Sequence, residues 1–130
     1  MKIESGKLKS GLPIVVCPMS SLESVTVGFW VGVGGRYEER AQMGISHFIE
    51  HLLFKGTKKR NALQITEAIE GVGGYLNAFT SEENTCYYAS ATARHLDLIL
   101  EVLSDMVLGS NFPADEVERE RGVICEEIRM

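Results

Sequence analysis

The sequence of 130 residues predicts an α+β domain in which helices cover one face of a mainly antiparallel β-sheet. Two kinds of pattern support this fold class. Short runs rich in β-branched and aromatic residues are separated by Gly, Pro and Asn, which is typical of strands joined by turns. Longer runs carry apolar residues at 3.6-residue spacing, which is typical of helices packed on a sheet. In chain order these runs give β-β-β-α-α-β-β-α-α.

The first three predicted strands are residues 2–9, 14–17 and 25–33. The run 25–33 is the richest in Val, Phe and Trp, so we expect it to be the central strand. Glycines end this strand, but they do not form a phosphate-binding loop, because Tyr37 stands where the last glycine of G-x-G-x-x-G is required. We therefore interpret the glycines as a turn.

The remaining elements follow from apolar spacing and from turn residues. A helix is predicted from about residue 44 to 54, and a second runs from Leu63 to the glycines at 71–74. Residues 75–80 and 85–92 are β-rich and are joined by a short polar segment, which predicts a hairpin. Two more helices are expected, over 94–108 and from Pro113 to the end.

Composition excludes several classes of protein. The chain is 45% hydrophobic and 24% charged, as in ordinary soluble globular domains, and its net charge of −5 argues against nucleic-acid binding. Three widely spaced cysteines indicate a reducing compartment and no disulfide framework. We see neither a signal peptide nor an apolar run long enough to span a membrane. We therefore expect a cytoplasmic protein with no nucleic-acid or membrane partner.

The segment His47-Phe48-Ile49-Glu50-His51 is the most informative in the chain. On a helix, positions 47, 50 and 51 fall within an arc of about 100°, so two imidazoles and one carboxylate share a face. This H-x-x-E-H arrangement is associated with zinc-dependent peptide hydrolysis. The alternative is that His47 and His51 are ordinary half-buried histidines beside a glutamate.

The last predicted helix has an apolar face marked by three residues: Val117, Ile124 and Ile128. At 100° per residue, Glu120 and Glu127 lie about 60° and 80° from Val117, whereas Glu126 points outward. A carboxylate pressed against an apolar face needs a partner. A metal ion held by two histidines would be one, and an arginine or lysine at the rim would be another. Helix geometry alone leaves both open.

Three stretches together resemble the pitrilysin / mitochondrial processing peptidase family of inverted-motif zinc peptidases, and most closely its processing-peptidase branch with bacterial relatives. They are G-I-S-H-F-I-E-H-L-L-F-K-G-T at 44–57, G-G-Y-L-N-A-F-T-S-E-E-N-T-C-Y-Y-A at 73–89, and E-R-E-R-G-V-I-C-E-E-I at 118–128. The resemblance extends over nearly the whole chain. In that family the third zinc ligand is a glutamate on a later helix, and Glu127 matches it in spacing and context.

The resemblance implies a role for each residue of the metal site. His47, His51 and Glu127 would bind Zn²⁺, and Glu120 would support the site from behind the ligands. Glu50 would be the catalytic base that takes a proton from a zinc-bound water. Two imidazoles and one carboxylate leave one tetrahedral position open, which is typical of a catalytic zinc site.

The resemblance also implies where a peptide substrate binds. Phe54 matches an apolar residue that lines the pocket beyond the scissile bond. Asn77 and Ala78 match the edge strand onto which the peptide is laid. At 82–83 the chain has Glu-Glu where many relatives have Arg-Glu, which changes the local charge but not the ligand set.

Family domains are longer than this chain and come in pairs that close over the substrate like a clamshell. The resemblance therefore implies that residues 1–130 are the N-terminal, zinc-binding part of a catalytic peptidase domain. The partners expected are a peptide substrate, a missing C-terminal half or partner subunit that completes the clamshell, and another copy in a homo-oligomer. Alone, the chain is expected to be weakly active or inactive.

The function that best fits is a zinc metalloendopeptidase that hydrolyses peptides or extended protein segments, leader peptides among them. One alternative is a non-catalytic, substrate-presenting or structural subunit of the same family, although such subunits have degraded zinc motifs. Another is a structural zinc domain or interaction module, although structural zinc sites use four protein ligands, often cysteines.

Overall fold

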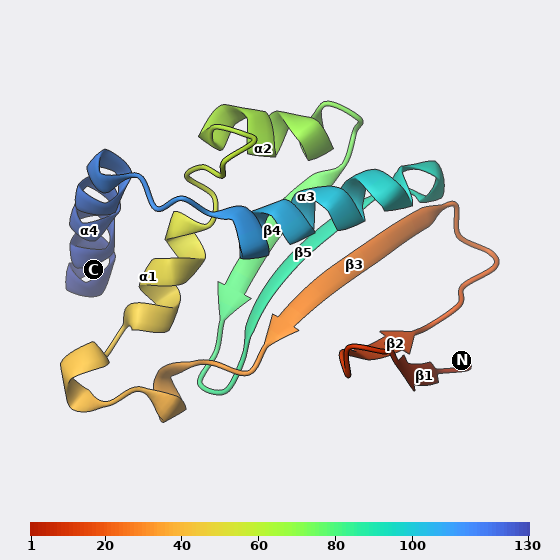
Figure 1. Cartoon of the computed structure of the whole chain (residues 1–130), viewed down its shortest axis with the longest axis horizontal. Helices are drawn as coiled ribbons and strands as arrows, with labels where there is room; N and C mark the ends of the chain where they lie inside the picture. The colour runs from red at the N-terminus through yellow and green to blue at the C-terminus, as the bar shows by residue number, and fades with distance from the viewer.

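The computed structural model describes residues 1–130 and confirms the α+β fold class and the order of the main elements (Figure 1). The strands and helices, in chain order, are β1 Glu4–Lys7, β2 Pro13–Val16, β3 Ser24–Val31, α1 Ile45–Leu52, α2 Ala62–Glu70, β4 Tyr75–Thr80, β5 Thr85–Thr92, α3 Leu96–Gly109 and α4 Ala114–Arg129. Single 3₁₀ turns occupy Gly35–Tyr37, Arg40–Gln42 and Ala93–His95.

The main sheet is antiparallel, with strand order β3-β5-β4. Strand β5 lies in the centre and pairs along its length with β3, from Ser24 opposite Thr92 to Val31 opposite Thr85. The expectation that the strand within 25–33 is central is therefore wrong, since β3 is an edge strand. The hydropathy of a strand reports how its faces are covered and does not report its neighbours.

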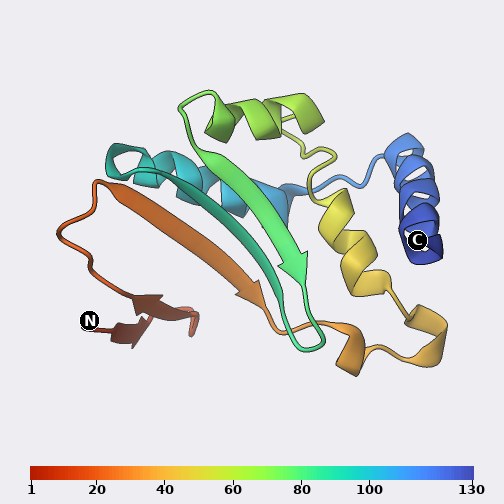
Figure 2. The same cartoon turned by 180° about the vertical axis from the view of Figure 1, so that it is seen from behind.

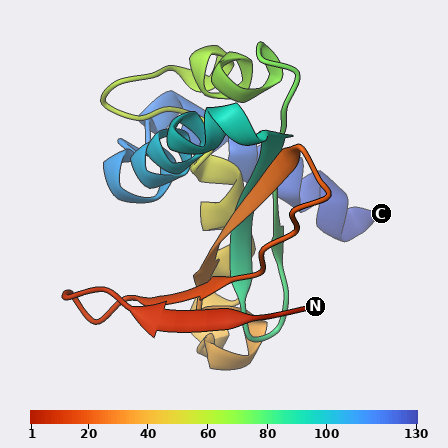
Figure 3. The ribbon, with the colours of Figure 1, turned by 90° about the vertical axis from the view of Figure 1, so that its right-hand side faces the viewer.

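Helices α2 and α3 lie side by side on one face of this sheet (Figures 1 and 3). The core fills the space between them and comprises Leu53, Ile65, Ile69, Leu76, Tyr87, Ala89, Ala91, Ile99, Val102, Leu103 and Met106. A capping box at Asn61 and Gln64 begins α2, because each side chain accepts a hydrogen bond from the other residue's backbone N–H. Helix α2 is thus fixed by the cap at its start as well as by the packing of its apolar face.

The opposite face of the sheet is exposed and aromatic. The ring of Trp30 on β3, which is 65% exposed, meets Phe79 on β4 edge to face, with ring centroids 5.5 Å apart. Tyr88 on β5 lies 6.2 Å from Phe79 and 6.2 Å from Tyr75. Cross-strand aromatic pairs of this kind stabilise a sheet beyond the area they bury.

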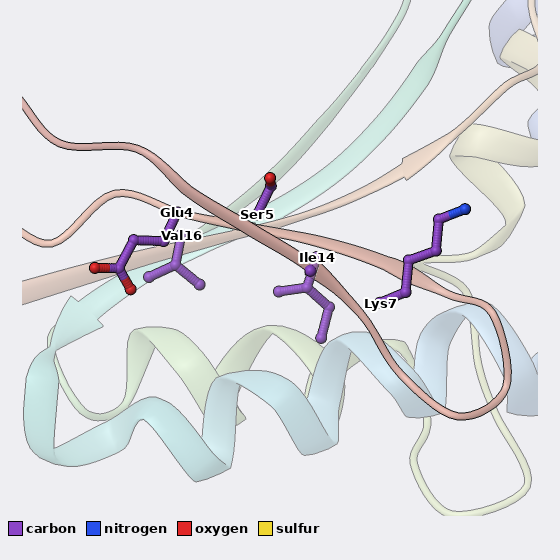
Figure 4. Close-up of a pocket in the computed structure, with 6 residues that line it drawn as sticks. Glu4, Ser5, Lys7, Ile14 and Val16 are labelled. Carbon is purple, nitrogen blue, oxygen red and sulfur yellow. The ribbon is translucent and has the colours of Figure 1, made fainter.

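Strands β1 and β2 form a separate two-stranded antiparallel hairpin whose residues are all exposed. It lies away from α1 and α4 (Figures 1 and 2). An open hollow of about 290 Å³ follows the hairpin, and Figure 4 shows the side chains along it. Its lining of Glu4, Ser5, Gly6, Lys7, Ile14 and Val16 brings together no catalytic set.

Helix α1 packs against strand β4 on one side and against α4 on the other. Figure 2 shows α1 between the sheet and α4. None of the four helices combines the length and the apolar character that crossing a bilayer requires. The arrangement brings a short helix, an edge strand and the last helix together at one end of the molecule.

The core between α2 and the sheet leads to a stability prediction. Ile69 is 0% exposed, so Ile69→Ala is expected to lower the free energy of unfolding by about 2–5 kcal/mol through lost burial and a new cavity. Leu63 lies on the same helix but is 64% exposed, so Leu63→Ala is the matched control and should have a small effect. Urea denaturation measures both, and equal losses would contradict this core assignment.

Candidate metal centre

The start of α1 is held by a residue that sequence reasoning missed. Gly44 precedes the helix with a φ of 90°, a conformation that favours glycine, and no local side chain caps the helix. The Glu38 carboxylate does so instead, because it accepts hydrogen bonds from the N–H of Gly44 at 2.6 Å and of Ser46 at 2.8 Å. The N–H of Ser46 and then that of Gly44 lower the pKa of Glu38. The sequence signal that could have identified Glu38 is an acidic residue a few positions before a predicted helix start.

Helix α1 then presents His47, Glu50 and His51 towards β4 and α4. The Nε2 atoms of His47 and His51 face each other at 3.1 Å. Oε2 of Glu127, on α4, lies 3.6 Å from Nε2 of His47 and 3.8 Å from Nε2 of His51. The ligand atoms of the three residues all lie within 4.8 Å of one another. The fold therefore brings together residues that are separated by most of the chain.

The other side of His51 is tied to a buried carboxylate. Nδ1 of His51 lies 3.0 Å from Oε2 of Glu120, a residue only 4% exposed, and Lys55 Nζ lies 2.9 Å from Oε1 of the same carboxylate. Burial raises the pKa of Glu120, but hydrogen bonds from Lys55 and His51 outweigh burial and leave that pKa below its usual value. Glu120 is therefore ionised at neutral pH. The bond to it places the ring proton of neutral His51 on Nδ1.

This donor set fits a zinc ion. With its proton on Nδ1, neutral His51 has a lone pair on Nε2, and that atom faces the corresponding nitrogen of His47. Two such nitrogens need a proton or a cation between them. Zinc–nitrogen distances of about 2.0–2.1 Å and tetrahedral angles separate two ligand atoms by about 3.3 Å, close to the 3.1 Å found here. The Glu127 carboxylate offers a third oxygen donor, and no cysteine belongs to this group.

Glu50 points from α1 to the end of β4. The Thr80 hydroxyl donates to its Oε2 at 2.5 Å. Burial, and then the charge of Glu50, raise the pKa of the Tyr87 hydroxyl. Thr80 is a second residue that sequence reasoning missed, although it lies inside the 73–89 stretch. Its hydroxyl holds one oxygen of the Glu50 carboxylate in place.

Asn77 and Ala78 lie on β4, which is an edge strand of the sheet. The N–H of Ala78 donates to Oδ1 of its neighbour Asn77 at 2.8 Å, and the Asn77 amide donates to the Tyr75 hydroxyl at 2.7 Å. Phe54 lies just beyond α1 and is partly buried against the core. An open hollow of about 300 Å³ adjoins the site and is lined by Gly35, Glu38, Gly44, His47, Thr80, Ser81 and Glu82, none of them apolar.

The buried face of α4 is narrower than expected, since Val117 is only half-buried and Glu127 is exposed. Ile124 is buried, but Ile128 is 77% exposed, because α4 contacts the rest of the chain mainly through α1, a helix of only eight residues. The nearby arginines do not pair with Glu120 or Glu127. Arg119 and Arg121 instead bind the glutamates three residues before them on the same helix.

Comparisons with known proteins identify the family of this chain. The family described as Insulinase (Peptidase family M16) matches residues 14–130. A Streptomyces coelicolor protein named an uncharacterized zinc protease is 50% identical over 123 residues, and the mouse mitochondrial-processing peptidase subunit beta is 46% identical over 122. The crystal structure of a protease from Helicobacter pylori superposes with a TM-score of 0.93 at 36% identity, over 98% of this chain. The chain therefore belongs to the M16 peptidase family, and the family resemblance noted in the sequence is confirmed.

The relatives are much longer than this chain. It spans 27% of the Streptomyces protein, 25% of the mouse subunit and 31% of the Helicobacter protease, while 95%, 94% and 98% of its own length are covered.

The Glu38 contacts lead to a prediction about α1. Glu38→Gln retains the shape of the side chain but leaves only one acceptor oxygen for two N–H groups, so it is expected to cost about 1 kcal/mol of stability at pH 7. The folded-state pKa of Glu38 is depressed, so its contribution is complete above the ordinary glutamate pKa and is lost as the pH falls through the lower folded value. Urea denaturation from pH 7 to pH 3 measures this difference. Glu39→Gln is the control, and a difference that persisted in acid would contradict the prediction.

Proposed function

We propose that the chain forms the zinc-binding part of a metalloendopeptidase that hydrolyses peptides or extended protein segments, leader peptides among them. The observation that carries this proposal is the convergence of His47, His51 and Glu127, with the Glu50 carboxylate on the same helix face. Family membership and the names of the relatives support it. Because those relatives are much longer, we take residues 1–130 as one part of a larger catalytic unit.

The metal would be held by Nε2 of His47, Nε2 of His51 and a carboxylate oxygen of Glu127. Three protein ligands leave one tetrahedral position open, which distinguishes a catalytic zinc site from a structural one. Zinc in such a site supplies a Lewis acid that polarises the peptide carbonyl and acidifies water. Glu120 holds His51 in the tautomer whose Nε2 lone pair faces the site, and Lys55 offsets the charge of Glu120.

Glu50 serves as the general base in this proposal. It takes a proton from the water whose oxygen attacks the peptide carbonyl carbon, and it returns that proton to the amine nitrogen as the peptide bond breaks. The Thr80 hydroxyl bound to Oε2 orients the carboxylate, so Oε1 is the oxygen that moves the proton. Both steps conserve protons and need no further reactant.

The substrate would bind as an added strand on β4. The edge position of β4 and the contact from Thr80 to Glu50 support this, because a peptide laid along Asn77 and Ala78 would then run towards the base. A substrate carbonyl would replace Oδ1 of Asn77 as the acceptor of the Ala78 N–H. Phe54 would contact the side chain just beyond the scissile bond. Backbone pairing of this kind accepts many sequences.

A second part of the protein or a partner subunit would cover this open site. One relative, the mitochondrial-processing peptidase subunit beta, is itself named as a subunit. A homo-oligomer is the other arrangement, with a second copy in the facing position. A non-catalytic role has less support, because the three candidate ligands converge and Glu50 lies on the same helix as the two histidines.

The metal site is tested by elemental analysis of the purified chain. We expect about one zinc ion per chain, and we expect it to be lost in His51→Ala/Glu127→Ala, which leaves a single ligand. Glu126→Ala is the matched control, because Glu126 is exposed on the same helix and pairs only with Arg129. The proposed ligand set is wrong if the double variant retains zinc, or if the control loses it while remaining folded.

The base is tested by Glu50→Gln, which retains the size of the side chain and removes its proton-accepting charge. Zinc content should be unchanged, whereas kcat/KM for metal-dependent cleavage of an extended fluorogenic peptide should fall by at least about 100-fold. The assay compares the variant with wild type in the assembly that shows cleavage. Glu67→Gln on α2 is the control. Full activity of Glu50→Gln would exclude the general-base role.

A further inference from the structure

The loop that follows α1 and the loop that precedes α4 lie against each other. Helices α1 and α4 carry the proposed metal ligands. Residues 53–61 follow α1, and residues 110–113 precede α4. Across the two segments Asn111 donates from its backbone N to the carbonyl of Gly56 at 3.3 Å and from its side-chain amide to the carbonyl of Thr57 at 3.4 Å. The N–H of Lys58 donates to the carbonyl of Gly109 at 3.1 Å, and Thr57 forms an isolated antiparallel bridge with Ser110.

Thr57 is at the centre of this junction and is 5% exposed. Its hydroxyl donates to Oδ2 of Asp105 on α3 at 2.7 Å and accepts from the N–H groups of Lys59 at 3.1 Å and Arg60 at 3.0 Å. Arg60 donates to the same Asp105 oxygen at 3.0 Å and forms a second ion pair with Glu101, one turn earlier on α3. Every hydrogen-bonding capacity of the Thr57 hydroxyl is therefore used, in a site with little water.

The junction has little room to adjust. A Cβ on Gly109 would lie 2.8 Å from Oδ1 of Asp105, and that carboxylate is held by Thr57 and Arg60. Gly56 has a φ of 146°, which other residues rarely adopt, and its own Cβ position is 3.3 Å from Oδ1 of Asn111. The two backbones thus approach each other closely and cannot slide without breaking buried hydrogen bonds.

Helix α4 depends on this junction for its position. Only Glu120 and Ile124 of its sixteen residues are buried, so side-chain packing alone fixes it weakly. Lys55, at the start of the first loop, binds Glu120, and Glu120 binds His51. A shift of the loop pair would therefore move both Glu127 and the carboxylate that orients His51.

We propose that Thr57, through Asp105 and Arg60, is a positioning residue that sets the spacing of α1 and α4 and so brings Glu127 to His47 and His51. The inference rests on the proposed zinc site. Such a site needs its ligand atoms placed to within about 0.2 Å, so a small shift between two helices is sufficient to weaken binding.

The test compares two substitutions with opposite consequences. Thr57→Val retains the shape and loses all three hydrogen bonds, whereas Thr57→Ser retains the hydroxyl and loses a methyl group. Zinc Kd is measured on the whole chain by competition with a chelator, well below the unfolding temperature. We expect Thr57→Val to weaken binding by about tenfold and Thr57→Ser to bind like wild type. Ile69→Val, a core change away from both loops, is the control for general destabilisation and should leave the Kd unchanged.

Equal zinc affinity in Thr57→Val and wild type would overturn the positioning role, as would an equal loss in Ile69→Val. If wild type binds no zinc, the proposed metal site itself is wrong. In that case the ¹⁵N shifts of the His51 ring test separately whether Thr57 positions the two helices. A single Nδ1–H tautomer in wild type that becomes mixed in Thr57→Val supports it, and unchanged shifts overturn it. Should Thr57→Val not fold, Arg60→Met replaces it, because that side chain lies nearer the surface.

Discussion

A single buried carboxylate, Glu120, connects the parts of this structure that matter for its chemistry. Removing a charge from water is costly, so its position is sustained only by the ammonium of Lys55 and the ring of His51. Those partners belong to the end of α1 and the loop after it, while the carboxylate belongs to α4. The need to satisfy one ion therefore holds α1 and α4 together. The same contact decides which nitrogen of His51 is available to a metal.

The elements around the site differ in how much the apolar core supports them. The sheet, α2 and α3 form the apolar core, and α1 lies between β4 and α4 at the border of that core. Helix α1 buries only part of its apolar surface, since Leu52 is buried but Ile45 and Ile49 are 42% and 37% exposed. Polar contacts at its two ends also hold the helix in place, with Glu38 at the start and Lys55 just beyond its end.

Much of the fold could be predicted because local patterns determine it. The hairpin 75–80 and 85–92 agrees with β4 and β5 residue for residue, since turn residues and β-branched runs are local signals. The order of strands in the sheet was not predictable from hydropathy, and the strand within 25–33 lies at an edge. Helical periodicity identified the buried side of α4 at Glu120 and Ile124 but failed at Ile128, because it cannot tell where the neighbouring helix ends.

For the candidate site, too, local patterns predicted some residues and missed others. Spacing within 47–51 indicates which side chains share a helix face, and the family likeness relates Glu127 to them across the chain. Thr80 and Thr57 escaped notice because each acts through a long-range hydrogen bond. Glu38 escaped notice because it lies outside the predicted helix and reaches the N–H groups of Gly44 and Ser46 across a loop. Neither kind of contact leaves a periodic trace in the sequence.

The aromatic row on the open face of the sheet has a practical consequence. Trp30 is the single tryptophan of the chain, and its indole ring rests against Phe79, a residue of the strand that also carries Asn77 and Ala78. Indole fluorescence responds to the polarity and the packing of its surroundings. The protein thus carries an intrinsic optical reporter that touches β4 from across the intervening strand β5 and responds to changes in the packing of β4 without any attached dye.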